Sequence, residues 1–241
     1  VERKHILIHT LQLPQYTALF FNREHGPILK EASVRTALEH ALEKERVLRE
    51  ALNGEGAVIY SPILPGFPGY NPELPRLSYS LDEANTLLDT ISNRVSAGEY
   101  RALRKAELVA QAEEEQKAMS SSTEALPYEP PVPLDGGASA IADEAARRDA
   151  LIVAIDAKLD QELNPAQTFY RKEKAKDGDM FIVTLVTADT KEYRDAAELI
   201  AGSWQEVGVK TELTFVSPKD ISRLALKSRD YDILLYGAIV G

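Results

Sequence analysis

The sequence contains no cysteine, and this absence excludes disulfide bonds, thiolate nucleophiles and cysteine-based metal sites. It does not fix the compartment, because many exported proteins also lack cysteine. Basic residues are outnumbered as well: 28 Lys and Arg against 38 Asp and Glu give a net charge of −10. The sequence shows no basic face of the kind that nucleic acid requires, and anionic membrane surfaces are disfavoured for the same reason.

Long apolar runs are also missing. No stretch approaches the roughly 20 residues of a membrane helix, and no basic segment followed by an apolar stretch opens the chain, so we expect no signal peptide in it. The start at Val1 rather than at methionine suggests an excised or processed product. What is present is 241 residues, 44% of them hydrophobic, which is enough to bury the core of a large α/β domain.

Patterns typical of catalysis and metal binding are absent too. Residues 66–69 (GFPG) lack the Lys-Ser/Thr ending of a phosphate loop, and no serine lies in a nucleophile-elbow pattern. His5 and His9 would lie about 13 Å apart on one face of a strand, and His25 and His40 have no ligand partner at suitable spacing. We therefore expect no enzyme activity, no metal and no cofactor.

In the first 93 residues, short apolar groups predict strands at 5–8 and 16–21. A helical stripe that follows Ser33 predicts one helix as far as Leu52. Five prolines between 60 and 80 predict a loop without regular structure. After the loop, Ser80 and Glu83 form a capping-box pair that predicts a short helix through Leu88.

Residues 94–168 differ in character, because they carry six of the ten excess negative charges. Two helices are predicted at 94–118 and 138–163, joined by a Pro- and Ser-rich linker at 120–137 that should be mobile or poorly packed. We interpret 94–168 as an inserted helical hairpin that separates two segments of one lobe, 1–93 and 169–241. The hairpin is either a solvated, charged excursion or a docking surface for a membrane partner or neighbouring protein.

The last third of the chain alternates strands with helices. Strands are predicted at 181–186, 209–216 and 231–236, a helix at 190–207, and a further helix that starts at 217–220. The order β-α-β-α-β predicts right-handed crossovers and a mostly parallel sheet with flanking helices.

Three stretches carry a family resemblance. They are 20–22 (FFN) with 33–38 (SVRTAL), then 79–88 (YSLDEANTLL), then 185–237, which includes AAELIAGSWQEVGVKTEL and YDILLYG. In this order they resemble the extracellular solute-binding proteins of peptide and nickel ABC importers. The resemblance implies a periplasmic-binding-protein-like lobe, the carboxy-terminal one, without the family's first lobe. It also implies that residues 11–20 and 236–241 lie together, because both lead to the hinge between lobes.

A ligand site follows from the same fold. In open α/β sheets ligands bind at the carboxyl ends of the strands, and the resemblance puts the interlobe cleft on that side. The candidate residues there are Thr187, Asp189, Tyr193, Ser217, Tyr236, Gly237, Ala238, Ile239, Val240 and Gly241. The backbone from Gly237 to Gly241 can pair with an extended ligand, as in strand addition. The alternative interpretations are that the two glycines only form turns and that Tyr193 only packs in the core.

The resemblance implies the substrate-binding component of an ABC importer, outside the cytoplasm, in the periplasm or at the cell surface. Such a protein captures an oligopeptide or similar solute between two lobes, docks on a permease, and reaches the membrane through a partner or an anchor outside this chain. Two departures stand out: Ala238 occupies a place where peptide-binding members often have an aromatic residue, and no aromatic residue occurs at 217–219. These departures support an alternative, an interaction or scaffold module that uses the helical insertion to bind a protein.

Overall fold

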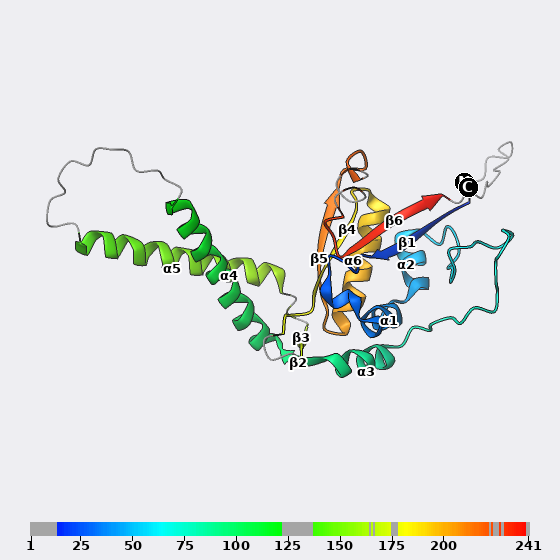
Figure 1. The fold of residues 1–241 in the computed structure, drawn as a ribbon, viewed down its shortest axis with the longest axis horizontal. Helices are drawn as coiled ribbons and strands as arrows, with labels where there is room; N and C mark the ends of the chain where they lie inside the picture. The colour runs from blue at the N-terminus through cyan, green and yellow to red at the C-terminus, as the bar shows by residue number, and fades with distance from the viewer. Residues whose placement is uncertain are drawn as a thin grey trace, which may run out of the picture. The chain divides into compact units, whose positions relative to one another are not determined.

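The computed structural model describes residues 14–121, 137–163, 165, 167–174, 178–221, 223, 227 and 229–239. The chain forms two compact units (Figure 1). Unit 1 comprises residues 1–93 and 171–241, and unit 2 comprises residues 94–170. The sequence predicted an insertion at residues 94–168. That this segment can be removed without unfolding the rest of the chain stays a prediction.

A four-stranded sheet forms the centre of unit 1. Its order is β1 (Gln15–Phe21), β6 (Ile233–Ile239), β4 (Ile182–Ala188) and β5 (Lys210–Val216). β4 is parallel to both β5 and β6, whereas β1 is antiparallel to β6. The predicted α/β fold with a mostly parallel sheet is therefore confirmed. The pairing of β1 with β6 also brings the described residues of 11–20 and 236–241 together, as expected.

Alternating side chains of β4 and β6 enter different cores on the two faces of the sheet. Leu185 and Ile233 belong to the larger core, which the helices α1 (Ala32–His40), α2 (Lys44–Ala51), α3 (Leu81–Ile91) and α6 (Lys191–Glu206) cover. Val186 and Leu234 belong to a smaller core on the other face, closed by Ile221 and Tyr231. Burial on both faces explains why β4 and β6 are nearly continuous apolar runs.

Trp204 ties α6 to the helices that pack beside it. Its indole is fully buried and donates a hydrogen bond of 2.9 Å to the carbonyl oxygen of Leu38 in α1. A buried indole N–H normally requires such a partner. The apolar stripe of α6, with Ala197, Ile200 and Trp204, is buried in the larger core.

The single helix predicted from Ser33 to Leu52 is two helices. α1 ends at His40, α2 begins at Lys44, and the turn between them contains Ala41 and Leu42. Both turn residues are buried in the larger core. In a continuous helix two adjacent residues point about 100° apart, so the break in the helix lets both face the core. Tertiary packing thus overrides the helical stripe.

The capping pair before α3 forms on one side only. Ser80 Oγ accepts a hydrogen bond of 3.2 Å from the backbone N–H of Glu83, as predicted. The backbone N–H of Ser80 donates instead to the carbonyl oxygen of His40, at 2.9 Å. The Glu83 carboxylate, left without its usual partner in the motif, lies 3.1 Å from Nδ1 of His40.

Two short strands, β2 (Ser92–Ser96) and β3 (Phe169–Glu173), form a separate two-stranded sheet, and the chain passes from one unit to the other within each of these strands. Neither strand was predicted. β3 places Arg171 in the interior of unit 1, where its side chain is fully buried. The guanidinium donates to Val207 O at 2.5 Å, to Asp89 Oδ1 and Asn85 Oδ1 at 2.7 Å each, and to Ser92 Oγ at 3.0 Å. This network binds α3 and the end of α6 to β3.

Unit 2 consists mainly of α4 (Ala97–Ser121) and α5 (Gly137–Glu162). Its buried side chains among the described residues are Val95, Tyr100, Ile155, Leu159 and Tyr170, and the two tyrosine rings stack with centroids 3.8 Å apart. Arg101 donates to Asp160 and Asp156, and Lys105 to Asp156, so ion pairs join α4 to α5. Ile155 and Leu159 of α5 are buried, whereas Ala145 of the same helix is exposed.

Several predictions concern residues outside the described ranges. These are the strand at 5–8, His5 and His9, the site residues Val240 and Gly241, and the linker at 120–137 apart from its ends. The helix predicted from 217–220 is described only in part. There the carbonyl oxygen of Ser217 accepts from the N–H of Asp220 at 2.8 Å and of Ile221 at 3.1 Å, which forms a turn.

Candidate functional site

The carboxyl ends of the parallel strands bring the predicted site residues to one edge of the sheet. Thr187 near the end of β4 stands in register with Phe215 of β5 and Leu235 of β6. Beyond β4, the N–H of Asp189 donates to Val216 O at 2.7 Å, which holds Asp189 beside the segment that starts with Ser217. The edge therefore carries two groups: Thr187 with Tyr193 and the end of β6, and Asp189 with Ser217.

Thr187 stabilises this edge of the sheet from inside the protein. Its side chain is fully buried, and its hydroxyl donates a hydrogen bond of 2.9 Å to the carbonyl oxygen of Leu235. The bond satisfies the polar group inside the sheet, where an unpaired hydroxyl would be costly. Thr187 thus shapes the end of β6 and presents no free group to a solute.

Asp189 carries a charge that the protein itself engages. Arg194 donates to Asp189 Oδ1 at 2.5 Å, and this hydrogen bond lowers the pKa of the carboxyl below its ordinary value. The same guanidinium lies 4.1 Å from the ring centroid of Phe215. Asp189, Arg194 and Phe215 therefore form a linked patch at the end of β4 and β5. Ser217 follows it with an exposed side chain.

Among the described strands, only β1 pairs with the end of β6. β1 pairs with β6 along its length, from Phe21 opposite Ile233 to Gln15 opposite Ile239. β4 pairs with β6 only at Ile233, Leu234 and Leu235. From Tyr236 to Ile239 the side of β6 away from β1 is consequently not paired with β4. Strand addition by an extended ligand is confined to that side.

Tyr193, in the first turn of α6, lies over this stretch of β6. Its hydroxyl oxygen is 2.7 Å from the point that a Cβ atom would occupy at Gly237. The ring is half-buried and packs against both cores, while the hydroxyl has no hydrogen-bond partner among the described residues. The Tyr193 ring thus packs against both cores and its hydroxyl lies beside Gly237, while a role in ligand binding stays a prediction.

A polar cluster at the opposite end of the sheet was missed in the sequence. His25 bridges two carboxylates, with Nδ1 2.9 Å from Asp232 Oδ1 and Nε2 3.0 Å from Asp230 Oδ1. Asp232 Oδ2 also accepts from the backbone N–H of Thr184 at 2.8 Å. The hydrogen bond to Asp232 raises the pKa of His25. The partners are more than 200 residues apart along the chain, so no local spacing signals the cluster.

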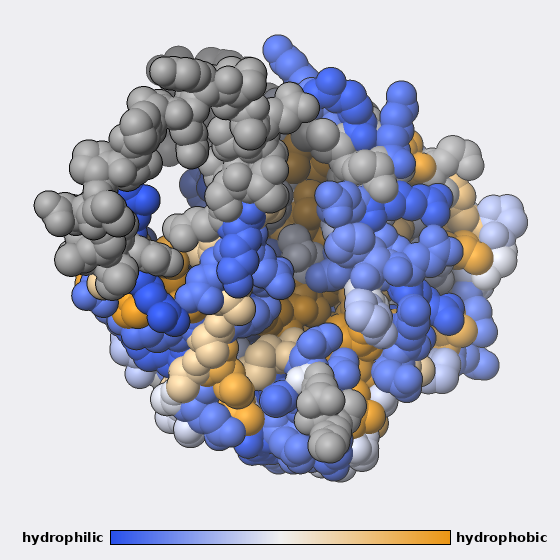
Figure 2. Space-filling view, turned by 60° about the vertical axis from the view of Figure 1, so that its left-hand side comes forward, coloured by the Kyte–Doolittle hydropathy of each residue, from blue (hydrophilic) through white to orange (hydrophobic). Residues whose placement is uncertain are grey.

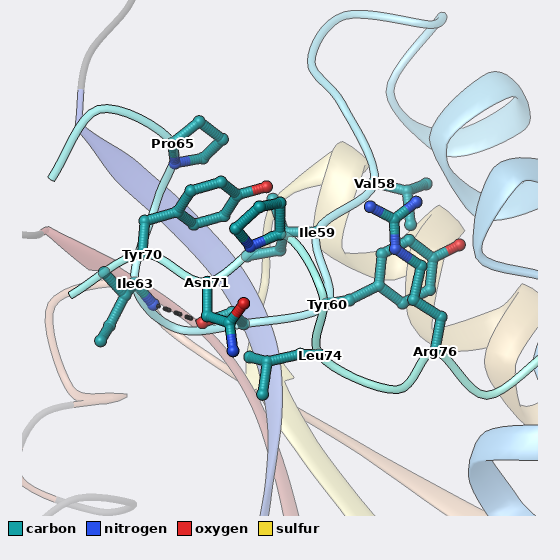
Figure 3. A pocket seen from close by; sticks show the side chains of 11 residues that line it. Val58, Ile59, Tyr60, Ile63, Pro65, Tyr70, Asn71, Leu74 and Arg76 are labelled. Carbon is teal, nitrogen blue, oxygen red and sulfur yellow. Dashed lines mark hydrogen bonds between the residues drawn. The ribbon is translucent and has the colours of Figure 1, made fainter.

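A hollow in the loop between α2 and α3 was missed as well. Tyr60, Ile63, Tyr70, Asn71, Leu74 and Arg76 are among the residues that line it (Figure 3). In the sequence, the feature that could have indicated this hollow is the alternation of Tyr60, Phe67 and Tyr70 with prolines and glycines.

Figure 2 shows one face of the molecule, on which hydrophilic residues predominate and hydrophobic residues reach the surface in patches.

The arrangement supports binding. The edge offers backbone groups, a tyrosine hydroxyl and an engaged carboxylate. Among the described residues, no group of three or more His, Asp and Glu side chains is placed to hold a metal ion. Within the same ranges no helix combines the length and hydrophobicity of a membrane-spanning segment.

Comparison with known proteins agrees with a solute-binding lobe. The profile of the bacterial extracellular solute-binding proteins, family 5 (middle region), matches residues 2–127, just over half of the chain. The chain therefore belongs to the family 5 bacterial extracellular solute-binding proteins, as the sequence motifs predicted. The family consists of binding proteins and not of enzymes. No curated protein matched the chain.

Solved structures share the fold at low identity. The oligopeptide-binding protein AppA from Bacillus subtilis, in complex with a nonapeptide, is 18% identical with a TM-score of 0.54; the match covers 95% of this chain and 32% of AppA. NikA from Brucella suis, in complex with Fe(III)-EDTA, is 16% identical with a TM-score of 0.55, over 94% of this chain and 31% of NikA.

The oligopeptide-binding protein from Thermus thermophilus, in complex with a pentapeptide, is 12% identical with a TM-score of 0.56, over 94% of this chain and 28% of that protein. The chain thus spans about a third of the length of the solved proteins that it resembles.

Proposed function

We propose that this chain is one lobe of the substrate-binding component of an ABC importer, which captures an oligopeptide or similarly elongated solute between two lobes. The observation that carries the proposal is the side of β6 at Tyr236–Ile239 that no described strand pairs with, together with the Tyr193 hydroxyl near Gly237. An extended peptide requires such a row of backbone donors and acceptors, and a nearby hydroxyl adds one more partner.

The lobe supplies only one wall of such a site. Closure of a second lobe would exclude water from the peptide backbone and complete its hydrogen bonds, and tight binding depends on such enclosure. Closure is a population shift that contacts to both lobes drive, and the closed form would dock on the permease. The protein would work outside the cytoplasm, in the periplasm or at the cell surface, held near the membrane by a partner or an anchor outside this chain.

Calorimetry with a pool of random pentapeptides tests the proposal on two proteins. For the 241-residue chain alone we expect a Kd weaker than about 1 mM, roughly −4 kcal/mol. A protein that contains this chain together with the other lobe should bind far more tightly, and substitutions at Tyr236–Ile239 should weaken that binding. Micromolar binding by the 241-residue chain would contradict the two-lobe mechanism.

The alternative is an interaction module that binds a protein through α4 and α5. Its supporting observation is the exposed apolar side chains of these helices, Leu103 at 37% and Val153 at 67% exposure. Single exposed apolar side chains are ordinary on a solvated surface, so this observation is weak support. The calorimetric experiment separates the two functions, because an interaction module would leave the pentapeptide pool unbound in the two-lobed protein.

A further inference from the structure

The turn that follows β1 is fastened to the segment that precedes β6. The backbone N–H of Asn22 donates to Asp232 O at 2.7 Å, and the Asn22 side-chain amide donates to Arg229 O at 2.9 Å. Gly26 lies so close to this segment that a Cβ atom there would stand 2.8 Å from Asp232 Oδ1. Two parts of the chain that are far apart in sequence therefore form one closely packed polar cluster.

The His25 ring stands between two carboxylates of this cluster and can bond both of them only as a cation. Its Nδ1 is 2.9 Å from Asp232 Oδ1, and its Nε2 is 3.0 Å from Asp230 Oδ1. An ionised carboxylate only accepts hydrogen bonds, whereas a neutral imidazole has one N–H donor and one acceptor nitrogen. Both contacts are therefore hydrogen bonds in the imidazolium form. Loss of the proton leaves one ring nitrogen facing a carboxylate oxygen with no hydrogen between them.

The two carboxylates are not held equally. The Asp232 side chain is 14% exposed, and its second oxygen accepts from the backbone N–H of Thr184 in β4 at 2.8 Å. The Asp230 side chain is 81% exposed and has no other hydrogen-bond partner among the described residues. A neutral His25 ring therefore keeps Asp232 and loses Asp230, because the exposed carboxylate can turn toward water.

The charges around the ring come mainly from the two aspartates. The other charged residues on the turn, on the short helix η1 (Pro27–Lys30) that follows it and on the segment before β6 are Arg23, Glu24, Lys30 and Arg229. β4 contributes the N–H of Thr184 and no charged residue. The hydrogen bond to Asp232 raises the pKa of His25 above its ordinary value, and Asp230 acts in the same direction.

The segment that His25 holds also closes the smaller core of the sheet. Tyr231, the residue between the two aspartates, is buried in that core. Tyr193 and Tyr236, which the sequence placed at the candidate site, pack against the same core from the other side of the cluster of side chains. A change in how the segment is held thus acts on side chains that reach the sheet edge.

We propose that His25 is a pH-sensitive switch, which as a cation holds residues 229–232 to the turn after β1 and as a neutral ring releases Asp230. A histidine ring changes its charge near neutral pH, so the contact with Asp230 is made at acid pH and lost at alkaline pH. Asp232 keeps its bonds to Thr184 and Asn22 in both states, so the change is local and the sheet persists. The inference does not depend on the proposed function, because it concerns the end of the sheet opposite the candidate site.

Nuclear magnetic resonance on the ¹⁵N-labelled 241-residue chain, between about pH 5 and pH 9, tests the inference. The ring nitrogens of His25 report its protonation, and the backbone amides of Arg229 and Asp230 report the segment. We expect these two amides to shift with the same midpoint as the ring, and their heteronuclear NOE to fall on the alkaline side. The amide of Thr184, which Asp232 holds in both states, should keep its NOE.

Two aspartate variants separate the switch from a general effect of charge. Asp230→Asn should weaken proton binding by the His25 ring about two- to fivefold, a small factor because Asp230 is exposed. Asp220→Asn is the matched control, because Asp220 lies in the same connection between β5 and β6 but pairs with Arg223. It should leave the ring titration unchanged.

His25→Gln completes the test, because it removes the titrating group and keeps a polar side chain. In this variant the transition in the amides of Arg229 and Asp230 should disappear. A transition that survives the substitution would come from another group and would overturn the inference. So would amides that do not follow the ring in the parent chain, or a ring titration that is the same in Asp230→Asn as in the parent.

Discussion

The hydroxyl oxygen of Tyr193 lies 2.7 Å from the position where Gly237 would carry a Cβ atom. Contacts that short do not occur for real Cβ atoms, so an alanine at 237 and the tyrosine at 193 exclude each other in their present positions. The obstructing atom is the end of a side chain and not backbone, so the fold can adapt to the change.

We expect Gly237→Ala to lower the free energy of unfolding by about 1 kcal/mol. The double variant with Tyr193→Phe, which removes the obstructing oxygen, should recover most of this loss. Urea denaturation of both single variants and the double variant forms the cycle that isolates the contact. Strictly additive losses would show that the two residues do not meet.

Arg171 should be the most sensitive charged residue of unit 1. Arg171→Met removes the donors of four hydrogen bonds and leaves Val207 O, Ser92 Oγ and Asn85 Oδ1 without this partner in the interior. We expect a loss of about 3–5 kcal/mol in the free energy of unfolding. Urea denaturation monitored by circular dichroism measures the loss.

Lys174→Met is the control for this experiment. Lys174 is exposed and donates to the carbonyl oxygens of Asp89 and Thr90, close to the same network. Its loss should cost less than about 1 kcal/mol. Similar losses for the two variants would mean that burial of Arg171 does not decide its contribution.

His25 should make stability depend on pH. Its pKa is raised above the ordinary 6.5 in the folded protein, chiefly by the hydrogen bond to Asp232, so the folded state binds the proton more tightly than the unfolded state. The stabilisation is fully present below about pH 6.5 and is lost as the pH rises through the folded-state pKa. The effect is modest, because the His25 side chain is 44% exposed.

Urea denaturation of the parent chain and of His25→Gln, at intervals between about pH 5 and pH 8, measures this contribution. The difference in stability between the two proteins should be largest at the acid end and shrink toward the alkaline end. A difference that stays constant across the series would contradict the role of the histidine proton. Asp230→Asn, which removes the more exposed partner, should reduce the pH dependence only in part.

Replacement of residues 94–168 by a short Gly-Ser linker should leave a folded domain. Unit 1 keeps both cores of the sheet and every named partner of Arg171. We expect cooperative urea unfolding with a smaller m-value, because less surface is exposed when a shorter chain unfolds. Loss of cooperative unfolding would show that the hairpin is part of the core of unit 1.

The strands β4 and β6 of the main sheet could be predicted from the sequence because both of their faces are buried. β4 and β6 are short apolar runs, and their alternation with α6 implies the parallel order. β3 could not be predicted, because three of its five residues are charged and the partners that allow Arg171 to be buried are distant in the chain, in α3 and at Ser92 on one side and at Val207 on the other. From the sequence alone, a charged residue is expected to be exposed, because the distant partners that allow its burial cannot be identified.

The candidate site shows the same division. The edge was predicted from topology together with the family resemblance, since ligands in such sheets gather at the carboxyl ends of parallel strands. The individual roles depended on side-chain geometry that spacing does not reveal. Thr187 faces inward to Leu235, Asp189 is engaged by Arg194, and β1 takes one side of β6.

The antiparallel pairing of β1 with β6 has a mechanical consequence. Gln15 and Ile239 stand opposite each other at one end of the ladder. Tension applied to these two residues would load that end first, so the hydrogen bonds would break pair by pair, as in a zipper, rather than together in shear. Traction from flanking segments would thus peel β1 away at low force while the parallel strands β4 and β5 keep their pairing.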